Sequence, residues 1–363
     1  CMQYTLLVMS NFTFNFFKIP NENNNEMQIE ENEANNTNND QQHLIPKRIA
    51  LSYEKEVKPI LDGTYFETLH GVNKVAGFKK GLNAQSDIFQ ITNDQNSDVL
   101  TGFYEGGLKV WECTLDLMNY LQSLNDLNEF INNIVGTSSS SNNINILDLG
   151  CGHGLAGIYA FLLFNNKINN GNNISINNHN VKIFFQDLNI DVLKYCTAPN
   201  LFLNLDIPTT LLTTSDGNNS NDDGNGHNNN NNNNNEINDN VLNNDHRFQF
   251  WSGDWSYLLN DSNWNEEINK QNGFDLILTA DTIYAKPQMK KLAMFLYKTL
   301  PKQINSIALV GAKRYYFGTG GNVKDFIDEI HIISNGQLTC KQVAIYEDKQ
   351  SNIREIILVS NTK

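Results

Sequence analysis

Residues 146–154 constrain the fold of this chain more than any other segment. They read Ile-Leu-Asp-Leu-Gly-Cys-Gly-His-Gly, an apolar run that leads into three alternating glycines. The run at 144–149 is typical of a buried parallel strand, and a helical apolar pattern follows at 156–164. Glycines at a strand-to-helix turn let the backbone approach a ligand closely and adopt positive φ angles. The segment therefore predicts a Rossmann-like sheet with a ligand-binding turn.

Strand-like and helical apolar patterns alternate along the rest of the chain. Strands are predicted at 144–149, 182–186, 248–251, 274–279, 304–312, 337–346 and 353–360. Helices are predicted at 111–124, 156–164, 190–204 with a break at Pro199, 287–300 and 323–332. This alternation indicates α/β architecture. We predict a Rossmann-like, seven-stranded, mostly parallel sheet whose C-terminal hairpin places an antiparallel strand at one edge.

Composition divides the chain into an extension and one domain. Residues 1–97 lack sustained periodicity, so we predict a mostly disordered N-terminal extension. Residues 98–363 are predicted to form the domain, with Asn-rich tracts at about 165–180 and 213–245. Because such tracts bury too little apolar surface to offset their ordering entropy, they are predicted to be disordered insertions.

Charge and cysteine content restrict the partners. The formal net charge is -14, and binding to nucleic acid depends on basic side chains that neutralise phosphates. We therefore expect no direct nucleic-acid contact and favour a basic protein partner. The 5 cysteines show no metal-pair or disulfide spacing, so we expect no metal and a reducing, cytoplasmic compartment. No apolar run reaches the ~18–20 residues of a membrane span, and we expect a monomer without membrane association.

Two cofactors fit the glycine turn. A G-x-G-x-x-G pattern begins at Gly152, which leaves a nicotinamide-dependent dehydrogenase open. However, Asp148 precedes the first glycine, where a carboxylate suits a cationic, phosphate-free ligand such as S-adenosylmethionine better than a pyrophosphate. Asp187 ends the second strand, where an acid can bind both ribose hydroxyls; the Asn-rich tract explains its long separation from the glycines. We therefore favour S-adenosylmethionine.

Other segments lie at strand ends, where ligands bind in open α/β sheets. Trp111 and Glu112 would enter the cleft if their helix caps the sheet, although Trp111 also fits a core anchor. Residues 251–255 follow the third strand, where a carbonyl, an acid and an indole could hold an adenine by hydrogen bonds and ring contact. The segment also fits a surface loop closed by a Trp. Asp281 and Tyr284 offer a carboxylate and a phenol to the reacting centre, although Asp281 also fits a helix cap.

Two further features carry weaker predictions. Residues 311–321 place aromatic and basic side chains between glycines, which indicates a mobile loop that faces the substrate. His153 titrates in a useful range as an isolated side chain, but no partner is identifiable in the sequence. We therefore expect a structural role for His153 within the turn.

Taken together, these segments resemble the histidine protein methyltransferase family within the seven-strand methyltransferases. The likeness runs over residues 102–360 apart from the Asn-rich tracts, and its most specific parts are residues 104–114, 185–189, 252–255 and 316–321. Residues 9–14 also look like the start of that family, so Met9 is the expected initiator.

The resemblance implies methylation of one histidine, on the imidazole nitrogen remote from the main chain, in protein three of the large ribosomal subunit. It implies a cofactor site formed by Val110, Trp111, Glu112, Cys113, Thr114, Gly150, Gln186, Asp187, Leu188, Gly253, Asp254, Trp255 and Ala280. To these, the position of the glycine turn adds Asp148, Gly152 and Gly154.

The resemblance also implies a role for the segment after the fourth strand. Asp281 and Tyr284 match an acid-x-x-aromatic motif tied to substrate handling, and we predict both as catalytic. Asp281 is expected to fix the tautomer of the acceptor imidazole, so that Asp281→Asn lowers turnover and leaves cofactor affinity nearly intact. The family can carry a basic stretch before the third strand, which has the composition of a nuclear signal. Here that stretch is Asn-rich and acidic, so a cytoplasmic protein is expected, with the nucleus as a second compartment.

Three rival functions stay open at this point. A lysine protein methyltransferase shares the fold and the cofactor, but it must deprotonate its ammonium acceptor first. A nicotinamide-dependent dehydrogenase shares the glycine pattern, and Asp148 and the closing hairpin argue against it. A partner protein that binds the cofactor without catalysis is the third.

Overall fold

The computed structural model describes residues 44–49, 66–69, 72–76, 99, 104–124, 127–135, 143–170, 180–204, 247–300, 305–347 and 352–362. Most of the predicted extension, including Met9, lies outside these residues, as does the tract at 213–245. The tract at 165–180 is described at its two ends, and its first residues continue helix α5 (Leu155–Asn170).

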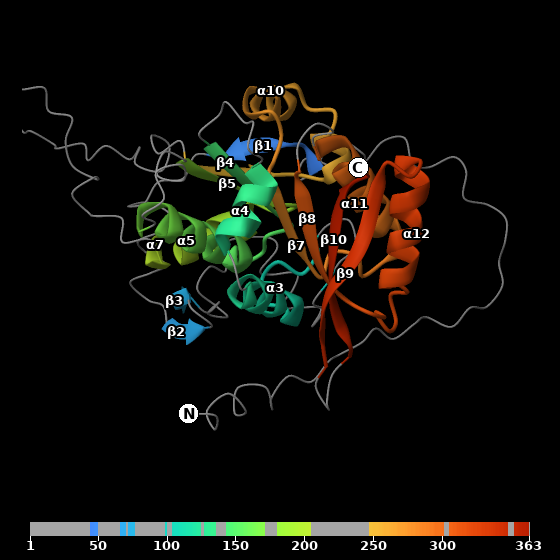
Figure 1. Ribbon diagram of the computed structural model, residues 1–363, viewed down its shortest axis with the longest axis horizontal. Helices are drawn as coiled ribbons and strands as arrows, with labels where there is room; N and C mark the ends of the chain where they lie inside the picture. The colour runs from blue at the N-terminus through green and yellow to red at the C-terminus, as the bar shows by residue number, and fades with distance from the viewer. Residues whose placement is uncertain are drawn as a thin grey trace, which may run out of the picture.

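An eight-stranded sheet with the order β1-β6-β5-β4-β7-β8-β10-β9 forms the centre of the fold (Figure 1). Its strands are β1 (Lys47–Ile49), β4 (Asn143–Leu149), β5 (Asn180–Asp187), β6 (Phe248–Ser252), β7 (Leu276–Ala280), β8 (Ile307–Lys313), β9 (Leu338–Tyr346) and β10 (Arg354–Asn361). The five strands from β6 to β8 in this order are parallel. The predicted fold class, a mostly parallel Rossmann-like sheet with an antiparallel C-terminal strand, is confirmed.

The position of the antiparallel strand differs from the prediction. β10 runs antiparallel to both β8 and β9, so it lies inside the sheet and β9 forms the edge. The sequence explains this order, because residues 356–359 are continuously apolar and mostly buried, as expected of a strand covered on both faces. β9 has several exposed residues instead, which suits an edge strand.

Two pairings come from the part of the chain that was predicted to lack structure. β1 runs antiparallel to β6 and forms the other edge of the sheet. A separate hairpin pairs β2 (Phe66–Leu69) with β3 (Val72–Ala76). Neither segment was predicted, since three to five residues are too few to show a period.

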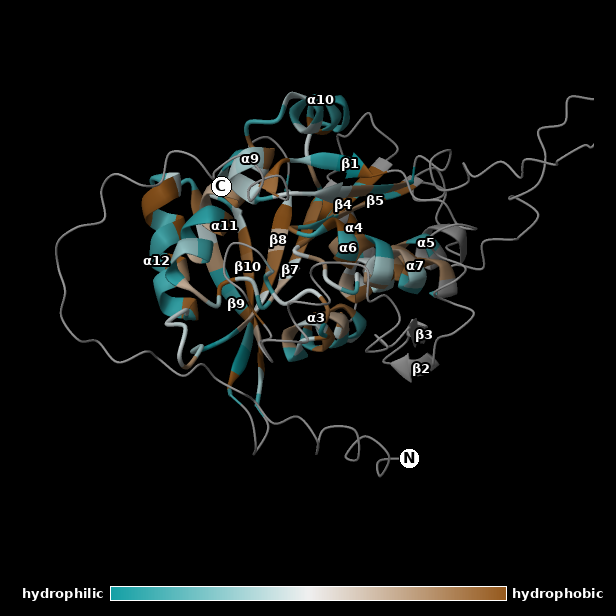
Figure 2. Ribbon diagram, turned by 180° about the vertical axis from the view of Figure 1, so that it is seen from behind, coloured by the Kyte–Doolittle hydropathy of each residue, from teal (hydrophilic) through white to brown (hydrophobic). Residues whose placement is uncertain are grey.

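Helices cover both faces of the sheet and enclose two hydrophobic cores. Figure 1 shows α3 (Glu112–Ser123), α4 (Leu127–Val135), α5 and α7 (Ala198–Asn204) on one side of the strands, with α11 (Lys286–Thr299) and α12 (Val323–Ser334) on the other. Neighbouring residues of β4 point to opposite faces, so Ile146 enters the first core and Leu147 the second. The strands accordingly appear as a hydrophobic centre in Figure 2.

The helical segment from residue 190 to 204 is not broken at Pro199. It runs through α6 (Ile190–Val192), a π-helical turn (Leu193–Thr197) and α7. Pro199 is the second residue of α7 and directly follows the π-helical turn. The π turn directs Thr197 toward the glycine turn, and its hydroxyl donates to the Gly152 carbonyl at 2.6 Å.

Three described helices were not predicted, namely α4, α9 (Trp255–Leu258) and α10 (Ser262–Gln271). In α10 only Trp264 is buried, so the helix shows no apolar stripe in the sequence. Its start is instead marked by Asp261, whose side chain accepts the Trp264 N–H at 2.8 Å. Helix α9 is a single short turn that follows β6.

The strand order creates one crevice at the centre of the sheet. From β4 the chain continues to β5 and β6 on one side, then returns to β7 and β8 on the other. The carboxyl ends of β4 and β7 therefore flank a topological switch point, where open α/β sheets bind ligands. Among the described residues, no helix is long and apolar enough to cross a membrane, and no acid, His and Cys cluster is arranged to hold a metal.

Candidate cofactor and acceptor site

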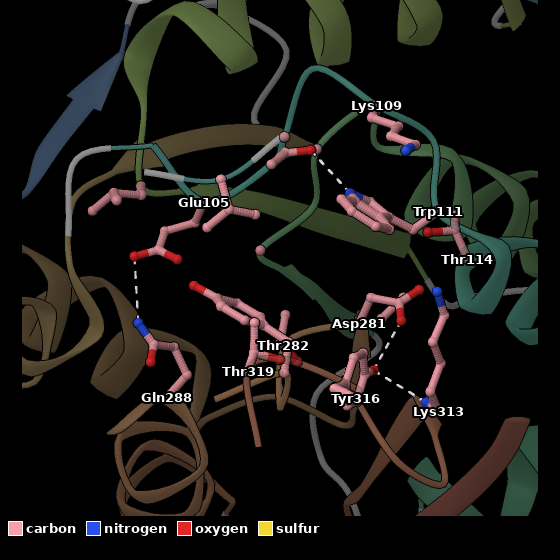
Figure 3. A pocket seen from close by; sticks show the side chains of 18 of the residues that line it. Glu105, Lys109, Trp111, Thr114, Asp281, Thr282, Gln288, Lys313, Tyr316 and Thr319 are labelled. Carbon is pink, nitrogen blue, oxygen red and sulfur yellow. Dashed lines mark hydrogen bonds between the residues drawn. The ribbon is translucent and has the colours of Figure 1, made fainter. Parts of the chain in front are cut away.

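A cavity of about 630 Å³ opens at this switch point (Figure 3). Its walls come from the carboxyl ends of β4 to β8, from the start of α11 and from residues 105–114. Most predicted site residues line it: Val110, Trp111, Glu112, Thr114, Gly150, Gly152, Asp187, Leu188, Gly253, Asp254, Trp255, Ala280, Asp281 and Tyr284. The volume lies within the range of small-molecule sites in proteins.

The glycine turn needs its glycines for backbone conformation and for close packing. Gly150 and Gly152 have φ angles of 63° and 53°, a region that other residues rarely adopt. A Cβ at Gly152 would lie 3.3 Å from the carbonyl oxygen of Gly107, in the segment that crosses over the turn. The turn and this segment therefore form one tight wall without side chains between them.

The Asp187 carboxylate holds the glycine turn in place and can still accept hydrogen bonds from a ligand. Its carboxylate accepts the Gly152 N–H at 3.0 Å through one oxygen and the Asn189 N–H at 3.1 Å through the other. Burial raises the pKa of Asp187 to about 6, although these N–H donors act to lower it. Each oxygen has a second lone pair, so the carboxylate can also accept ligand hydroxyls, as the sequence predicts for the ribose.

The raised pKa of Asp187 predicts that cofactor affinity depends on pH. The ionised carboxylate is the better acceptor for ribose hydroxyls, so affinity should be lost as the pH falls through about 6. Titration calorimetry with S-adenosylhomocysteine should show affinity about ten-fold lower at pH 5 than at pH 7. Asp187→Asn should bind more weakly and remove this step.

Asp148 provides the matched control for that experiment. Burial raises the pKa of Asp148 to about 7, so Asp148→Asn resembles its protonated form. This variant should keep the loss of affinity around pH 6. If Asp187→Asn kept the same pH profile as the wild type, Asp187 would not bind the ligand.

Four of the residues predicted for the cofactor site lie outside the cavity lining. These are Cys113, Asp148, Gly154 and Gln186. The Asp148 carboxylate is turned to the first turn of α5, where it accepts the Gly157 N–H at 2.9 Å. A Cβ at Gly154 would meet Thr197 at 2.7 Å, so Gly154 serves packing. Cys113 contributes its N–H, which donates to Asp281 at 3.1 Å.

Gln186 joins the walls of the site although it is fully buried behind them. Its Nε2 donates to the Gly253 carbonyl at 2.8 Å, and its Oε1 accepts the Trp255 indole N–H at 2.8 Å. The Gly150 N–H also points to this Oε1, at 3.4 Å. Gln186 therefore sets the positions of three cavity segments at once. Leu44 supports the same region through its carbonyl, which accepts the Asp254 N–H at 3.1 Å.

Asp281 lies at the centre of a hydrogen-bonded cluster at the end of β7. It adopts a φ of 55°, a strained conformation for a residue with a side chain and one that is concentrated at functional sites. One carboxylate oxygen accepts the Cys113 N–H, and the other accepts the Tyr316 hydroxyl at 2.8 Å. Burial raises the pKa of Asp281, opposed by the nearby Lys313 ammonium. Both oxygens are thus engaged within the chain.

Charged side chains flank Trp111 at the same end of the cavity. The Lys313 ammonium pairs with Glu112 at 3.0 Å and lies 5.5 Å from the centre of the Trp111 ring, while the Lys109 ammonium lies at 4.7 Å. The Trp111 indole N–H donates to the Gly106 carbonyl at 3.0 Å. Trp111 therefore lines the cavity rather than anchoring the core.

The opposite end of the cavity holds residues that sequence reasoning missed. Figure 3 shows Glu105 and Gln288 on this side, across from Asp281, Tyr316 and Lys313. Gln288 Nε2 donates to Glu105 Oε1 at 3.3 Å. These residues are 183 positions apart, so only the folded chain brings them together. The available signal was the place of Gln288 in the first turn of a helix predicted to begin at residue 287.

The charge of the lining favours a cationic ligand over a pyrophosphate. The carboxylates are Glu105, Glu112, Asp187, Asp254 and Asp281; the lysines are Lys109, Lys291 and Lys313. Two of the lysines are paired with lining acids, Lys291 with Asp254 at 2.6 Å and Lys313 with Glu112. This excess of acids in the lining fits the cationic S-adenosylmethionine.

Burial lowers the pKa of His153 to about 4, so its ring is neutral at pH 7, which suits the predicted structural role.

The strand order, the glycine turn after β4 and the acid at the end of β5 together form a Rossmann-like sheet with a ligand-binding crevice at its switch point. No family model matches the chain. It is 29% identical over 265 residues to "Histidine protein methyltransferase 1 homolog" of Dictyostelium discoideum, which covers 73% of this chain and 61% of that protein. It is 30% identical over 238 residues to "Histidine protein methyltransferase 1" of Schizosaccharomyces pombe, which covers 64% of this chain and 59% of that protein.

A mammalian relative extends the similarity. "Histidine protein methyltransferase 1 homolog" of Bos taurus is 27% identical over 300 residues, 82% of this chain and 68% of that protein. The predicted resemblance to histidine protein methyltransferases is confirmed, while the chain spans only about three fifths of the first two relatives. The solved structure of the citrinin polyketide synthase CMeT domain superposes on this chain with a TM-score of 0.38 and 10% sequence identity, over 77% of this chain and 58% of that domain. An overlap of this size does not bear on function.

Proposed function

We propose that this chain transfers the methyl group of S-adenosylmethionine to an imidazole nitrogen of a histidine in a protein substrate. The observation that carries the proposal is that segments from six parts of a chain similar to proteins named histidine protein methyltransferase line one acid-rich cavity. When bound, the cofactor supplies a methyl group on a cationic sulfur; the nitrogen–carbon bond forms as the carbon–sulfur bond breaks, and its electron pair stays on sulfur.

The residues of the chain act by binding and positioning. Asp187 and the glycine turn hold the nucleoside end, and Gln186 keeps Trp255 and Gly253 in register with them. Since a neutral imidazole is already a nucleophile, alignment with the methyl carbon supplies most of the acceleration. A lysine acceptor would in addition need a base that removes a proton from its ammonium. Asp281 accepts hydrogen bonds from Cys113 and Tyr316, so we assign it to the support of the cavity wall and favour histidine, the acceptor that needs no such base.

Two exposed aromatic side chains at the mouth of the cavity support a protein substrate. Tyr315 and Phe317 line the cavity and are 52% and 70% exposed. Between them, Tyr316 points inward to Asp281. The loop is held in place by bonds from the Tyr316 N–H to the Gly321 carbonyl at 2.8 Å and from the Gly321 N–H to the Tyr284 carbonyl at 2.9 Å. Exposed aromatic rings on an ordered loop are typical of contacts with a partner.

Phe317→Ala should weaken recognition of the protein substrate without affecting the cofactor. Loss of one aromatic contact of ~1–2 kcal/mol would raise KM for the protein about ten-fold. At saturating protein, kcat should stay the same, as should affinity for S-adenosylhomocysteine. Ile332→Ala is the control, because Ile332 is also 70% exposed but lies on α12 outside the cavity lining. We call Tyr315 and Phe317 the aromatic rim. An unchanged KM in Phe317→Ala would show that the aromatic rim does not bind the substrate.

We further propose that the substrate is protein three of the large ribosomal subunit. We propose that the enzyme encounters it in the cytoplasm, with the nucleus as a second compartment. The net charge of -14 supports a basic protein partner and a monomer without nucleic-acid or membrane contact. The test is incubation of purified large-subunit proteins with methyl-labelled cofactor. One basic protein should be labelled by the wild type. Label on several proteins, or on none, would overturn this choice of substrate.

A further inference from the structure

We propose that Gln288, with Tyr284 beside it, forms the subsite that holds the ring N–H of the acceptor histidine. This inference rests on the proposed function and adds a specificity-determining residue to it. Gln288 is 8% exposed, lines the cavity, and its Oε1 has no hydrogen-bond partner among the described residues. Tyr284 also lines the cavity, and its buried hydroxyl lacks a partner within the described part of the chain. Buried polar groups of this kind call for a ligand.

The orientation of the Gln288 amide is determined by its neighbour. Glu105 is an acid whose carboxylate only accepts hydrogen bonds, so Nε2 of Gln288 must be the atom that faces Glu105 Oε1 at 3.3 Å. The amide oxygen is then the atom that remains to accept. The subsite therefore offers one neutral acceptor and one phenol hydroxyl.

The subsite lies next to the entrance for a side chain from another protein. Tyr284 precedes α11, and its carbonyl accepts the Gly321 N–H of the loop that carries Tyr315 and Phe317. Ala285 pairs with Gly320 of the same loop. Figure 3 shows Thr319 of this loop between Gln288 and the Asp281 cluster. A side chain that passes the aromatic rim thus reaches Tyr284 and Gln288.

A neutral amide is chemically suited to a histidine acceptor. A neutral imidazole has one N–H and one lone pair, so an acceptor that binds the N–H leaves the other nitrogen free to attack. A carboxylate in this place would raise the pKa of the imidazole and favour the protonated ring, which cannot attack. The Gln288 oxygen carries no charge itself, and its amide separates the ring from the Glu105 carboxylate to which Nε2 donates. It takes the tautomer-fixing role that the sequence assigns to Asp281, which lies across the cavity from Gln288 (Figure 3).

The experiment compares two peptides and three proteins. One peptide carries the histidine that mass spectrometry identifies as methylated; the other carries thiazolylalanine there, a five-membered ring without an N–H. Binding is measured by calorimetry with S-adenosylhomocysteine present. The wild type should prefer the histidine peptide about 10- to 100-fold, the cost of a buried acceptor left unpaired. Gln288→Leu should bind both peptides equally, within about two-fold, with unchanged affinity for S-adenosylhomocysteine.

Two further variants keep the test decisive. Gln342→Leu makes the same change at an exposed position of β9 and should behave as the wild type. The exchange variant Glu105→Gln with Gln288→Glu restores an acceptor oxygen and should regain the preference. A preference kept by Gln288→Leu, or its loss together with cofactor affinity, would overturn the inference while histidine methylation by the wild type stands. If the wild type methylates no histidine, the proposed function and this subsite both fail.

Discussion

Gly152→Val is expected to abolish cofactor binding, with at least a ~100-fold loss of affinity for S-adenosylhomocysteine in titration calorimetry. The backbone of Gly152 has a φ of 53°, which a β-branched residue adopts only with strain. Already its Cβ would lie 3.3 Å from the Gly107 carbonyl oxygen, and the two methyl groups need further space. The Gly152 N–H that orients Asp187 would move with the turn. Steric exclusion and the loss of the Asp187 contact therefore act together.

Gly336→Val is the matched control for this substitution. Gly336 has a φ of 71°, so the variant carries a similar backbone strain, but its nearest neighbour atom lies 3.5 Å from the added Cβ. It follows α12 and does not line the cavity. This variant should lose stability and retain cofactor affinity. Normal affinity in Gly152→Val would refute the placement of the cofactor against the glycine turn.

Asp281→Asn is expected to lower turnover about 100-fold, the usual scale for losing one oriented polar group in an active site. The amide keeps the size of the carboxylate and tolerates the positive φ, but its NH₂ group cannot accept from Cys113 or Tyr316. The negative charge that faces Lys313 is also lost. Cofactor affinity should fall roughly three- to ten-fold, because Cys113 belongs to the segment that lines the cofactor cavity. The sequence-based expectation of nearly intact affinity changes accordingly.

Tyr316→Phe identifies the route through which Asp281 acts. If Asp281 acts by holding the Tyr316 hydroxyl, Tyr316→Phe should lose part of the same turnover, and the double variant should be no slower than Asp281→Asn alone. Asp328→Asn, an exposed acid on α12, serves as the control and should be silent. Steady-state assays with labelled cofactor measure all four variants. Full turnover in Asp281→Asn would exclude the cluster from the reaction.

Local patterns were sufficient to predict the sheet and the cofactor wall of the cavity. The run of apolar residues before Gly150 and the acid at the end of β5 are each contained in one segment, and parallel topology then places them at the same edge. Ten of the predicted site residues line the cavity for this reason, while Val110, Trp111, Glu112 and Thr114 reach it from the start of α3. The exceptions lie behind the lining: Asp148 accepts the Gly157 N–H of α5, and Gln186 donates to the Gly253 carbonyl in the cavity wall.

Long-range contacts explain what the sequence did not reveal. Residues 47–49 pair with β6 as a three-residue strand, too short to show alternation. The Gln288–Glu105 bond and the Asp281–Cys113 bond join residues 183 and 168 positions apart. From the sequence alone, Asp281 is predicted to be an acid whose carboxylate is available to the substrate. Only the fold shows that it is already bonded and that an amide on α11 offers the acceptor instead.

The most direct test of the proposed function is the chemical identity of the methylated residue. Large-subunit ribosomal proteins are incubated with S-adenosylmethionine and this protein, digested, and sequenced by tandem mass spectrometry. The account predicts one added methyl group on a histidine, identified as the isomer methylated on the imidazole nitrogen remote from the main chain, and absent from reactions with Gly152→Val. Methylation of lysine, or no methylation of any protein by the wild type, would contradict it.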